Sequence, residues 1–204
     1  CDAAVAIFAR PDLVNRPEAM QFAEVARGCA RSMAATVTVE EQGVRVRLQD
    51  DADRALVPLL IDTALRAKTM LAKDLGVDLP VPVHIDLVRD QFALSAMTGL
   101  PEEAARTTGT VAVAKWGRVT MLSPRATSGN YAWLDTLAHE MTHLALSRGT
   151  RDKAPLWLQE GVAKRQQTRW RDAEPLDDFP SDDAVARIGM ERGLGVELDK
   201  IGPS

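Results

Sequence analysis

The chain has 204 residues, of which 46% are hydrophobic and 26% charged, and its formal net charge at pH 7 is -4. This length and composition are those of an ordinary globular protein with one domain and a real core. The slightly acidic balance gives no indication of a nucleic-acid partner, and no apolar run approaches the length of a transmembrane segment.

The sequence begins with Cys1, and its second cysteine is Cys29. A mature bacterial lipoprotein begins with the cysteine that carries its lipid, which would make Cys1 an anchor and place the protein in the periplasm or cell envelope. The alternatives are a trimmed end of a longer chain and a disulfide from Cys1 to Cys29. Two cysteines are too few to indicate a disulfide framework.

The first half of the chain alternates between predicted helices and strands. Residues 18–35 carry apolar side chains at helical spacing, and we expect residues 1–36 to form a leading helix or the end of an upstream helical-repeat array. Residues 37–48 alternate around Gln42-Gly43, which predicts a short hairpin. Residues 53–75 predict an amphipathic helix that Gly76 ends.

Residues 83–88 predict a strand in which His84 lies opposite the apolar side chains of Val83, Ile85 and Leu87. We therefore expect His84 to be a surface or hydrogen-bonded histidine, with an auxiliary role near a cleft as the alternative. Residues 92–98 predict a short helix. Residues 108–123 predict a hairpin with its turn at Trp116-Gly117.

Residues 139–143 read HEMTH. On a helix, His139 and His143 lie one turn apart, so both imidazoles can bind one metal ion. Glu140 projects about 100° round the helix from His139 and can act as a general base on a water molecule. On the opposite side lie apolar side chains that predict a buried ridge: Leu134, Leu137, Met141 and Leu144.

The signals for the ends of this helix are Ser128-Gly129-Asn130 at its start and Arg148-Gly149 at its stop. A catalytic zinc usually takes three protein ligands and leaves the fourth position to water. Glu160 is the candidate for the third ligand, because Pro155 suits the first turn of a second helix that would carry it. Gly161 would let the two helices approach closely.

The segments HEMTH and PLWLQEGVA resemble the gluzincin metallopeptidases, most closely the peptidase MA-like family of bacterial proteins, whose form is HExxH followed by WLxEGxA. The similarity extends over about residues 37–170 and is strongest over 137–163. It implies an α+β, zincin-like fold, in which a small mixed sheet with an edge hairpin packs on the HExxH helix and a second helix carries the third ligand. Residues 37–172 would be the peptidase domain, and residues 173–204 an acidic linker with a C-terminal helix.

The resemblance implies one Zn²⁺ per chain, with His139, His143 and Glu160 as ligands and Glu140 as the catalytic base. Relatives often place an acidic residue one turn after the third ligand to orient a ligand histidine, whereas this chain has Lys164 there. Asp135, one turn before His139, is the substitute candidate for that orienting role.

Two further site elements are predicted. Proteases commonly hold a peptide as an added strand on a sheet edge, and the resemblance implies that the strand before the zinc helix does so, which makes Val111, Ala112 and Val113 the candidate substrate strand. The alternative, that Val111 and Val113 are core, is compatible with this role. Tyr131 could stabilise an oxyanion, with plain packing as the alternative.

The function expected is hydrolysis of peptide bonds in a peptide or protein substrate by a metal-activated water, with Glu140 as general base. The alternative is a catalytically weak pseudo-peptidase that acts as a protein-binding module or a scaffold for flanking helical repeats. Lys164 and the lack of a clear oxyanion donor motivate the alternative. The intact Glu140 argues against it, because a purely structural zinc would not need that residue.

Overall fold

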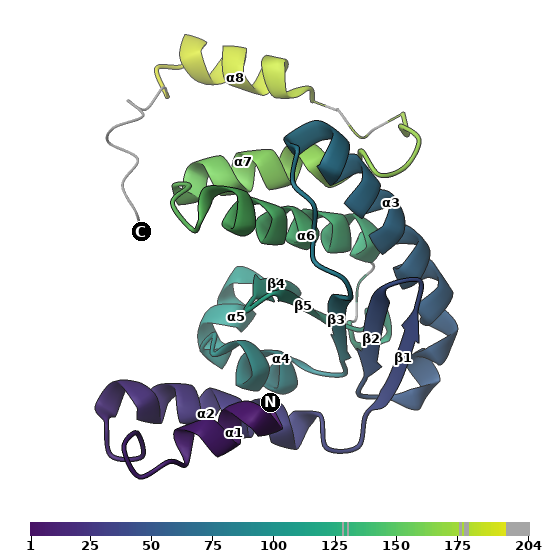
Figure 1. Cartoon of the computed structure of the whole chain (residues 1–204). Helices are drawn as coiled ribbons and strands as arrows, with labels where there is room; N and C mark the ends of the chain where they lie inside the picture. Colours follow the sequence, from purple (N-terminus) through teal and green to yellow (C-terminus); the bar gives the residue numbers. More distant parts are fainter. Residues whose placement is uncertain (128, 130, 176, 178–179, 195–204) are drawn as a thin grey trace.

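A mixed five-stranded sheet lies at the centre of the fold, in the order β1-β2-β3-β5-β4 (Figure 1). The structure is a computed structural model that describes the chain except residues 128, 130, 176, 178–179 and 195–204. The strands are β1 (Val37–Glu41), β2 (Val44–Leu48), β3 (Val83–Val88), β4 (Ala112–Lys115) and β5 (Arg118–Leu122). The protein is therefore α+β, as predicted.

The two hairpins of the sheet are antiparallel, while β3 pairs in parallel with both β2 and β5. Both predicted hairpin turns are confirmed: Gln42 and Gly43 have φ angles of 51° and 77°, and Trp116 and Gly117 have φ angles of 52° and 73°. Positive φ at both central residues is the signature of a type I′ turn, whose twist matches that of the strands it joins. Among the described residues, β5 is the only strand neighbour of β4, so β4 is an edge strand.

One face of the sheet carries the main core. Because side chains alternate along a strand, Val46, Ile85 and Val119 share this face and are fully buried. Two helices cover it: α3 (Val57–Leu75), which follows a 3-10 turn η1 (Asp51–Leu56), and α6 (Trp133–Thr150). The helix predicted over residues 53–75 is thus confirmed, with its first turn in 3-10 form.

Two other helices cover part of the opposite face, α2 (Pro17–Ser32) and α4 (Gln91–Thr98), as Figure 1 shows below the sheet. A second apolar cluster lies between these helices and the ends of β3 and β5; it contains Cys29, Met33, Val88, Leu94 and Leu122. Helix α1 (Asp2–Phe8) packs beside α2, where the Phe8 and Phe22 rings stack with centroids 6.1 Å apart.

Helix α5 (Glu102–Thr108) was not predicted, and α1 was not predicted as a separate helix within the helical segment 1–36. Each has seven residues, and α5 buries only Ala105 while α1 buries none. Both are too short to show the apolar periodicity that predicts the longer helices. The remaining elements are a 3-10 turn η2 (Pro124–Ala126), α7 (Leu156–Gln166) and α8 (Asp182–Glu191). None of the described helices is long and apolar enough to cross a membrane.

Cys1 and Cys29 form a disulfide that ties the start of α1 to α2. This is one of the pairings left open by the sequence. A lipid on Cys1 would occupy the same sulfur, so the lipid anchor and this disulfide exclude each other within one molecule.

The second sheet face also carries a charged cluster. Asp86, on β3, is 1% exposed and accepts two hydrogen bonds of 2.6 Å from Arg47 on β2. Arg118 on β5 donates a third, at 3.2 Å. One buried carboxylate therefore joins the three central strands.

Helices α2 and α4 approach closely at Gly28, and this contact gives a first prediction. A Cβ at Gly28 would lie 2.6 Å from the backbone oxygen of Ala96, which cannot move without shifting α4. We expect Gly28→Ala to lower the free energy of unfolding by about 1–3 kcal/mol in denaturant titration. Gly189→Ala in α8 is the control, because a Cβ there meets nothing within 4 Å. Equal stability of both variants would contradict the close contact.

Candidate metal centre

Helix α6 presents its two histidines on the side away from the core. Leu137 and Met141 are fully buried against the sheet and α3, while His139 and His143 are half-buried. The predicted ridge is confirmed at Leu137 and Met141, whereas Leu134 and Leu144 are only partly buried, and Leu144 lines the cleft described below.

The ends of α6 differ from the prediction. The helix begins at Trp133 after Ala132, which makes no side-chain capping bond, and the predicted caps Ser128 and Asn130 lie outside the described residues. The helix ends at Thr150, just past the predicted stop at Arg148-Gly149. The next residue, Arg151, is the C-cap and adopts the left-handed conformation with φ 54°.

Helix α7 runs beside α6 and brings in the third group (Figure 1). Pro155 is its N-cap, one position before the predicted first turn. The Glu160 carboxylate lies 3.5 Å from the Nε2 atom of His139 through one oxygen and 3.5 Å from that of His143 through the other. The two Nε2 atoms are 3.2 Å apart.

This donor set fits a zinc ion. Zinc bonds of 2.0–2.2 Å to nitrogen and oxygen in a tetrahedron place the ligand atoms about 3.3–3.6 Å from one another. The two Nε2 atoms, 3.2 Å apart, and the Glu160 oxygens, each 3.5 Å from a different Nε2 atom, are close to that range. Burial lowers the pKa of both His139 and His143, which favours the neutral imidazoles that bind metals. The three residues could therefore hold a divalent cation.

Glu140 lies beside this group, with its side chain nearly buried between α6 and β4. Burial raises its pKa to about 7, and the backbone N–H of Ala114, which donates to the carboxylate, opposes the rise. Ala114 belongs to the edge strand. The candidate base thus lies beside the strand that could receive a substrate.

A cleft of about 900 Å³ opens in front of these groups. One wall is β4 and its turn, and the other is formed by the facing sides of α6 and α7. Among its lining residues are Ala112, Val113, Ala114, Trp116, His139, Glu140, His143, Leu144, Gln159 and Glu160.

The structure changes the predicted substrate strand. Ala112 and Val113 lie in β4 and line the cleft, as expected. Val111 precedes the strand and packs against the second apolar cluster, and its carbonyl accepts a 2.8 Å hydrogen bond from Leu122. Its predicted alternative as a core residue is therefore the better description, and Ala114 takes its place beside the cleft.

Asp135 does not have the role predicted for it. Its carboxylate accepts hydrogen bonds from Arg171, at 2.8 and 3.0 Å, and from the Trp170 indole, at 2.9 Å. Among the described residues it has no hydrogen bond to a histidine. The preference of a carboxylate for a guanidinium in bidentate geometry explains the difference. Asp135 joins the start of α6 to the segment that follows α7.

Tyr131 is a packing residue. Its hydroxyl donates to the backbone carbonyl of Leu122, and its ring packs against the main core. Burial raises its pKa, and it is not among the residues that line the cleft. The oxyanion role is therefore not supported.

His84 is half-buried and alternates with the buried Val83 and Ile85, as predicted, and it is not among the residues that line the cleft. Its register neighbours are Arg45 and Arg118, on the charged sheet face opposite α6. Burial is the largest cause that lowers the pKa of His84, and the nearby positive charge of Arg118 lowers it further. The prediction for Gly161 was wrong, because a Cβ there would meet nothing within 4 Å.

Sequence reasoning missed Gln159. Its amide N–H donates to the carbonyl of Ala154 at 2.8 Å, and a hydrogen bond between its side chain and His143 raises the pKa of that histidine against the larger effect of burial. The pattern WLxEG leaves this position open, so the motif carried no signal for it. Lys164 lies near enough to His139 for its charge to lower that pKa.

No known family matches the chain when it is compared with models of protein families, and a search of curated proteins finds no significant relative.

Proposed function

We propose that this protein is a zinc-dependent peptidase of the gluzincin type with a zincin-like fold. The observation that carries the proposal is the convergence of His139, His143 and Glu160 beside Glu140, in a cleft bordered by an edge strand. Each of these features can occur alone without catalysis. Together they supply a metal-ligand set, a proton acceptor and a backbone surface for an extended chain.

When bound, zinc would supply Lewis-acid chemistry to a water molecule and to the substrate carbonyl. Glu140 would accept a proton from the attacking water and then donate it to the leaving amine, so that the C–N bond breaks and the carboxylate is regenerated. Ala114, on β4, lines the same cleft as Glu140. The remaining outward backbone groups of β4 would bind the peptide backbone.

The ligand set can be tested by metal analysis. We expect protein purified without added metal to contain about one zinc per chain, and Glu160→Ala to retain a small fraction of it because two imidazoles alone leave the usual set of three ligands incomplete. The measurement is elemental analysis after dialysis. Glu103→Ala, which removes an exposed carboxylate on α5, is the control and should keep its zinc. Full zinc in Glu160→Ala would exclude Glu160 as a ligand.

A protein-binding module with little turnover is the second candidate function. Lys164 favours it, because a positive charge near His139 opposes cation binding. The two functions differ in one observation: a module would bind unstructured peptide and leave it uncut even with stoichiometric zinc present.

We also propose an extracytoplasmic location. The support is the disulfide between Cys1 and Cys29, because disulfides persist mainly in oxidising compartments.

A further inference from the structure

We propose that an apolar pocket next to the metal cleft binds a large hydrophobic side chain of the substrate, and that Trp116 connects the pocket to the cleft. This inference rests on the proposed peptidase function and specifies its substrate: peptides with a bulky aliphatic or aromatic residue at a fixed distance from the cleaved bond.

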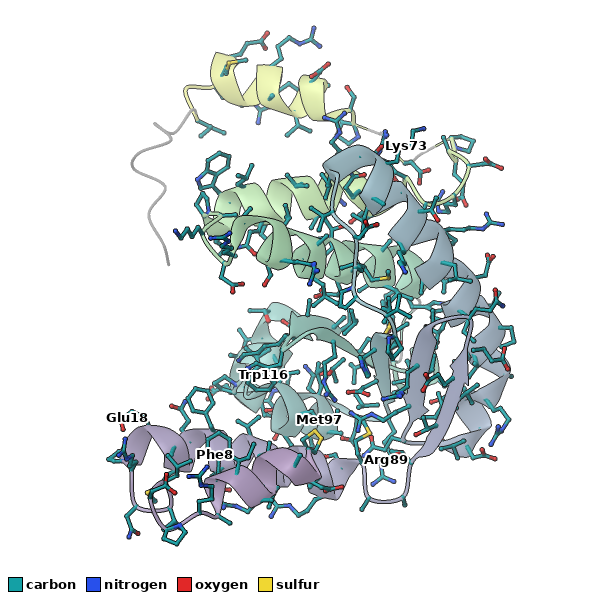
Figure 2. The ribbon with its side chains drawn as sticks, in the orientation of Figure 1. Phe8, Glu18, Lys73, Arg89, Met97 and Trp116 are labelled. Atoms are coloured by element: carbon teal, nitrogen blue, oxygen red, sulfur yellow. A yellow bond between two sulfur atoms is a disulfide. The ribbon has the colours of Figure 1, made fainter. Side chains whose placement is uncertain are left out.

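The pocket has a volume of about 290 Å³ and is bordered by α1, α2, α4 and the start of β5. Its walls are mostly apolar: Ala4, Phe8, Phe22, Val25, Ala26, Met97, Trp116 and the disulfide. Arg118 is the one charged residue at its border, and it already binds Asp86. Figure 2 shows Trp116 at the end of the β4–β5 hairpin, with Met97 and Phe8 on the side away from α6 and α7.

Trp116 lines both the pocket and the metal cleft. The two spaces therefore border the same side chain. A pocket of this size lies at the small end of the range for ligand sites, which suits one or two side chains better than a large molecule. A mostly apolar wall favours an aliphatic or aromatic group.

The conformation of Trp116 supports a role in binding. It has φ 52° at the first central position of a type I′ turn, where Asn, Asp and Gly are preferred and a bulky side chain is strained. Burial does not compensate for this strain, since the residue is 51% exposed. Residues held in such conformations are concentrated at functional sites.

Lys115 fixes the position of this indole ring. Its ammonium group lies 4.7 Å from the ring centroid and donates a 2.9 Å hydrogen bond to the carbonyl of Thr98 at the end of α4. The cation–π contact therefore holds the ring beside α4 and the pocket. An ordered exposed aromatic ring loses little conformational freedom when a ligand packs against it.

The register of β4 gives the distance between pocket and reaction centre. Ala114 and Glu140 both line the metal cleft, and Trp116, which lines both spaces, follows Ala114 by two residues. At no more than about 3.3 Å per residue, Trp116, in the turn just past the end of β4, lies within roughly 7 Å of Ala114. A peptide extended beside β4 would therefore place in the pocket a side chain about two residues from the bond at Glu140.

The test uses a zinc-loaded, full-length Glu140→Gln protein, so that peptide is bound without being cut. The probes are fluorescent peptides of Ala, Ser and Gly that carry one Leu, Phe, Ala or Asp at a scanned position. Fluorescence anisotropy should give a dissociation constant at least tenfold lower for Leu or Phe than for Ala at one position, and Asp should bind no better than Ala. The active protein should show the same preference in kcat/KM.

Trp116→Asn separates binding from folding. Asn-Gly is a preferred type I′ pair, so this variant should melt at a higher temperature than the wild type while its preference for Leu over Ala falls to within twofold. Phe22→Ala provides a second variant from the opposite wall, with Met20→Ala as its control. Both residues are on α2 and about half exposed, but Met20 lies outside the pocket.

The outcomes distinguish this inference from the peptidase proposal. Equal affinity for the Leu and Ala peptides, or full preference in Trp116→Asn, would overturn the inference even if the protein cuts peptides. A preference for Leu that Trp116→Asn abolishes would uphold it. If the active protein then left these peptides uncut, the binding pocket would be supported and the peptidase proposal would be rejected.

Discussion

Glu140→Gln is expected to lower kcat for peptide hydrolysis by about 10²–10⁴-fold while zinc content stays unchanged, because the amide keeps the shape of the side chain and cannot accept the proton from water. Glu140 is the carboxylate that the structure places beside the three candidate ligands without making it one of them. The measurement is hydrolysis of an unstructured protein at fixed zinc occupancy.

The control for this substitution is Glu102→Gln, the same chemical change on the exposed first turn of α5. It should leave kcat and zinc content as they are in the wild type. Hydrolysis that persists at the wild-type rate in Glu140→Gln would rule out this residue as the base. Loss of zinc together with activity would instead mean that Glu140 belongs to the ligand set.

Asp86→Ala should have the largest effect on stability, a loss of about 3 kcal/mol in the free energy of unfolding. Removing one partner of a buried ion pair usually costs about 3–5 kcal/mol, because the other charge is left uncompensated. Here Arg47 and Arg118 would both lose their carboxylate, but their side chains are 20% and 28% exposed, so water offsets part of the loss. The lower end of the range is therefore expected.

Denaturant titration with an unchanged m-value measures this loss. Glu40→Ala is the matched control on the same sheet, because it removes the partner of Arg45 in a pair whose side chains are 40% and 47% exposed. Its cost should stay below about 1 kcal/mol. If Asp86→Ala cost no more than Glu40→Ala, the buried carboxylate would not hold the central strands together.

The local elements could be predicted where periodicity and turn chemistry agree. The strand Val83–Val88 has the predicted limits, and both turns fall on the predicted pairs, Gln42-Gly43 and Trp116-Gly117. Alternation assigns faces along one strand, which is why His84 was placed correctly opposite the core. The strand order 1-2-3-5-4 and the parallel pairing of β3 depend on contacts between distant residues, and one sequence does not reveal them.

The candidate site, too, could be predicted only where local sequence patterns determine it. His139 and His143 follow from helix geometry, and Glu160 from the second motif and the proline before it. Gln159, Ala114 and the pocket behind Trp116 owe their positions to tertiary packing, which local patterns do not contain. The prediction for Asp135 failed because a spacing of one helical turn says nothing about competing partners, and Arg171, 36 residues away, binds both carboxylate oxygens.

That contact between Asp135 and Arg171 affects how the two ligand-bearing helices hold together. Helices α6 and α7 are joined at one end by the short connection at residues 151–155. At the other end they are joined by the ion pair between Asp135, at the start of α6, and Arg171, which follows α7. Two helices that are connected at both ends cannot easily move apart or slide along each other. These two connections therefore fix the distance between the imidazoles and the Glu160 carboxylate. Core packing contributes less, because Ala163 and Gln166 are the buried residues of α7.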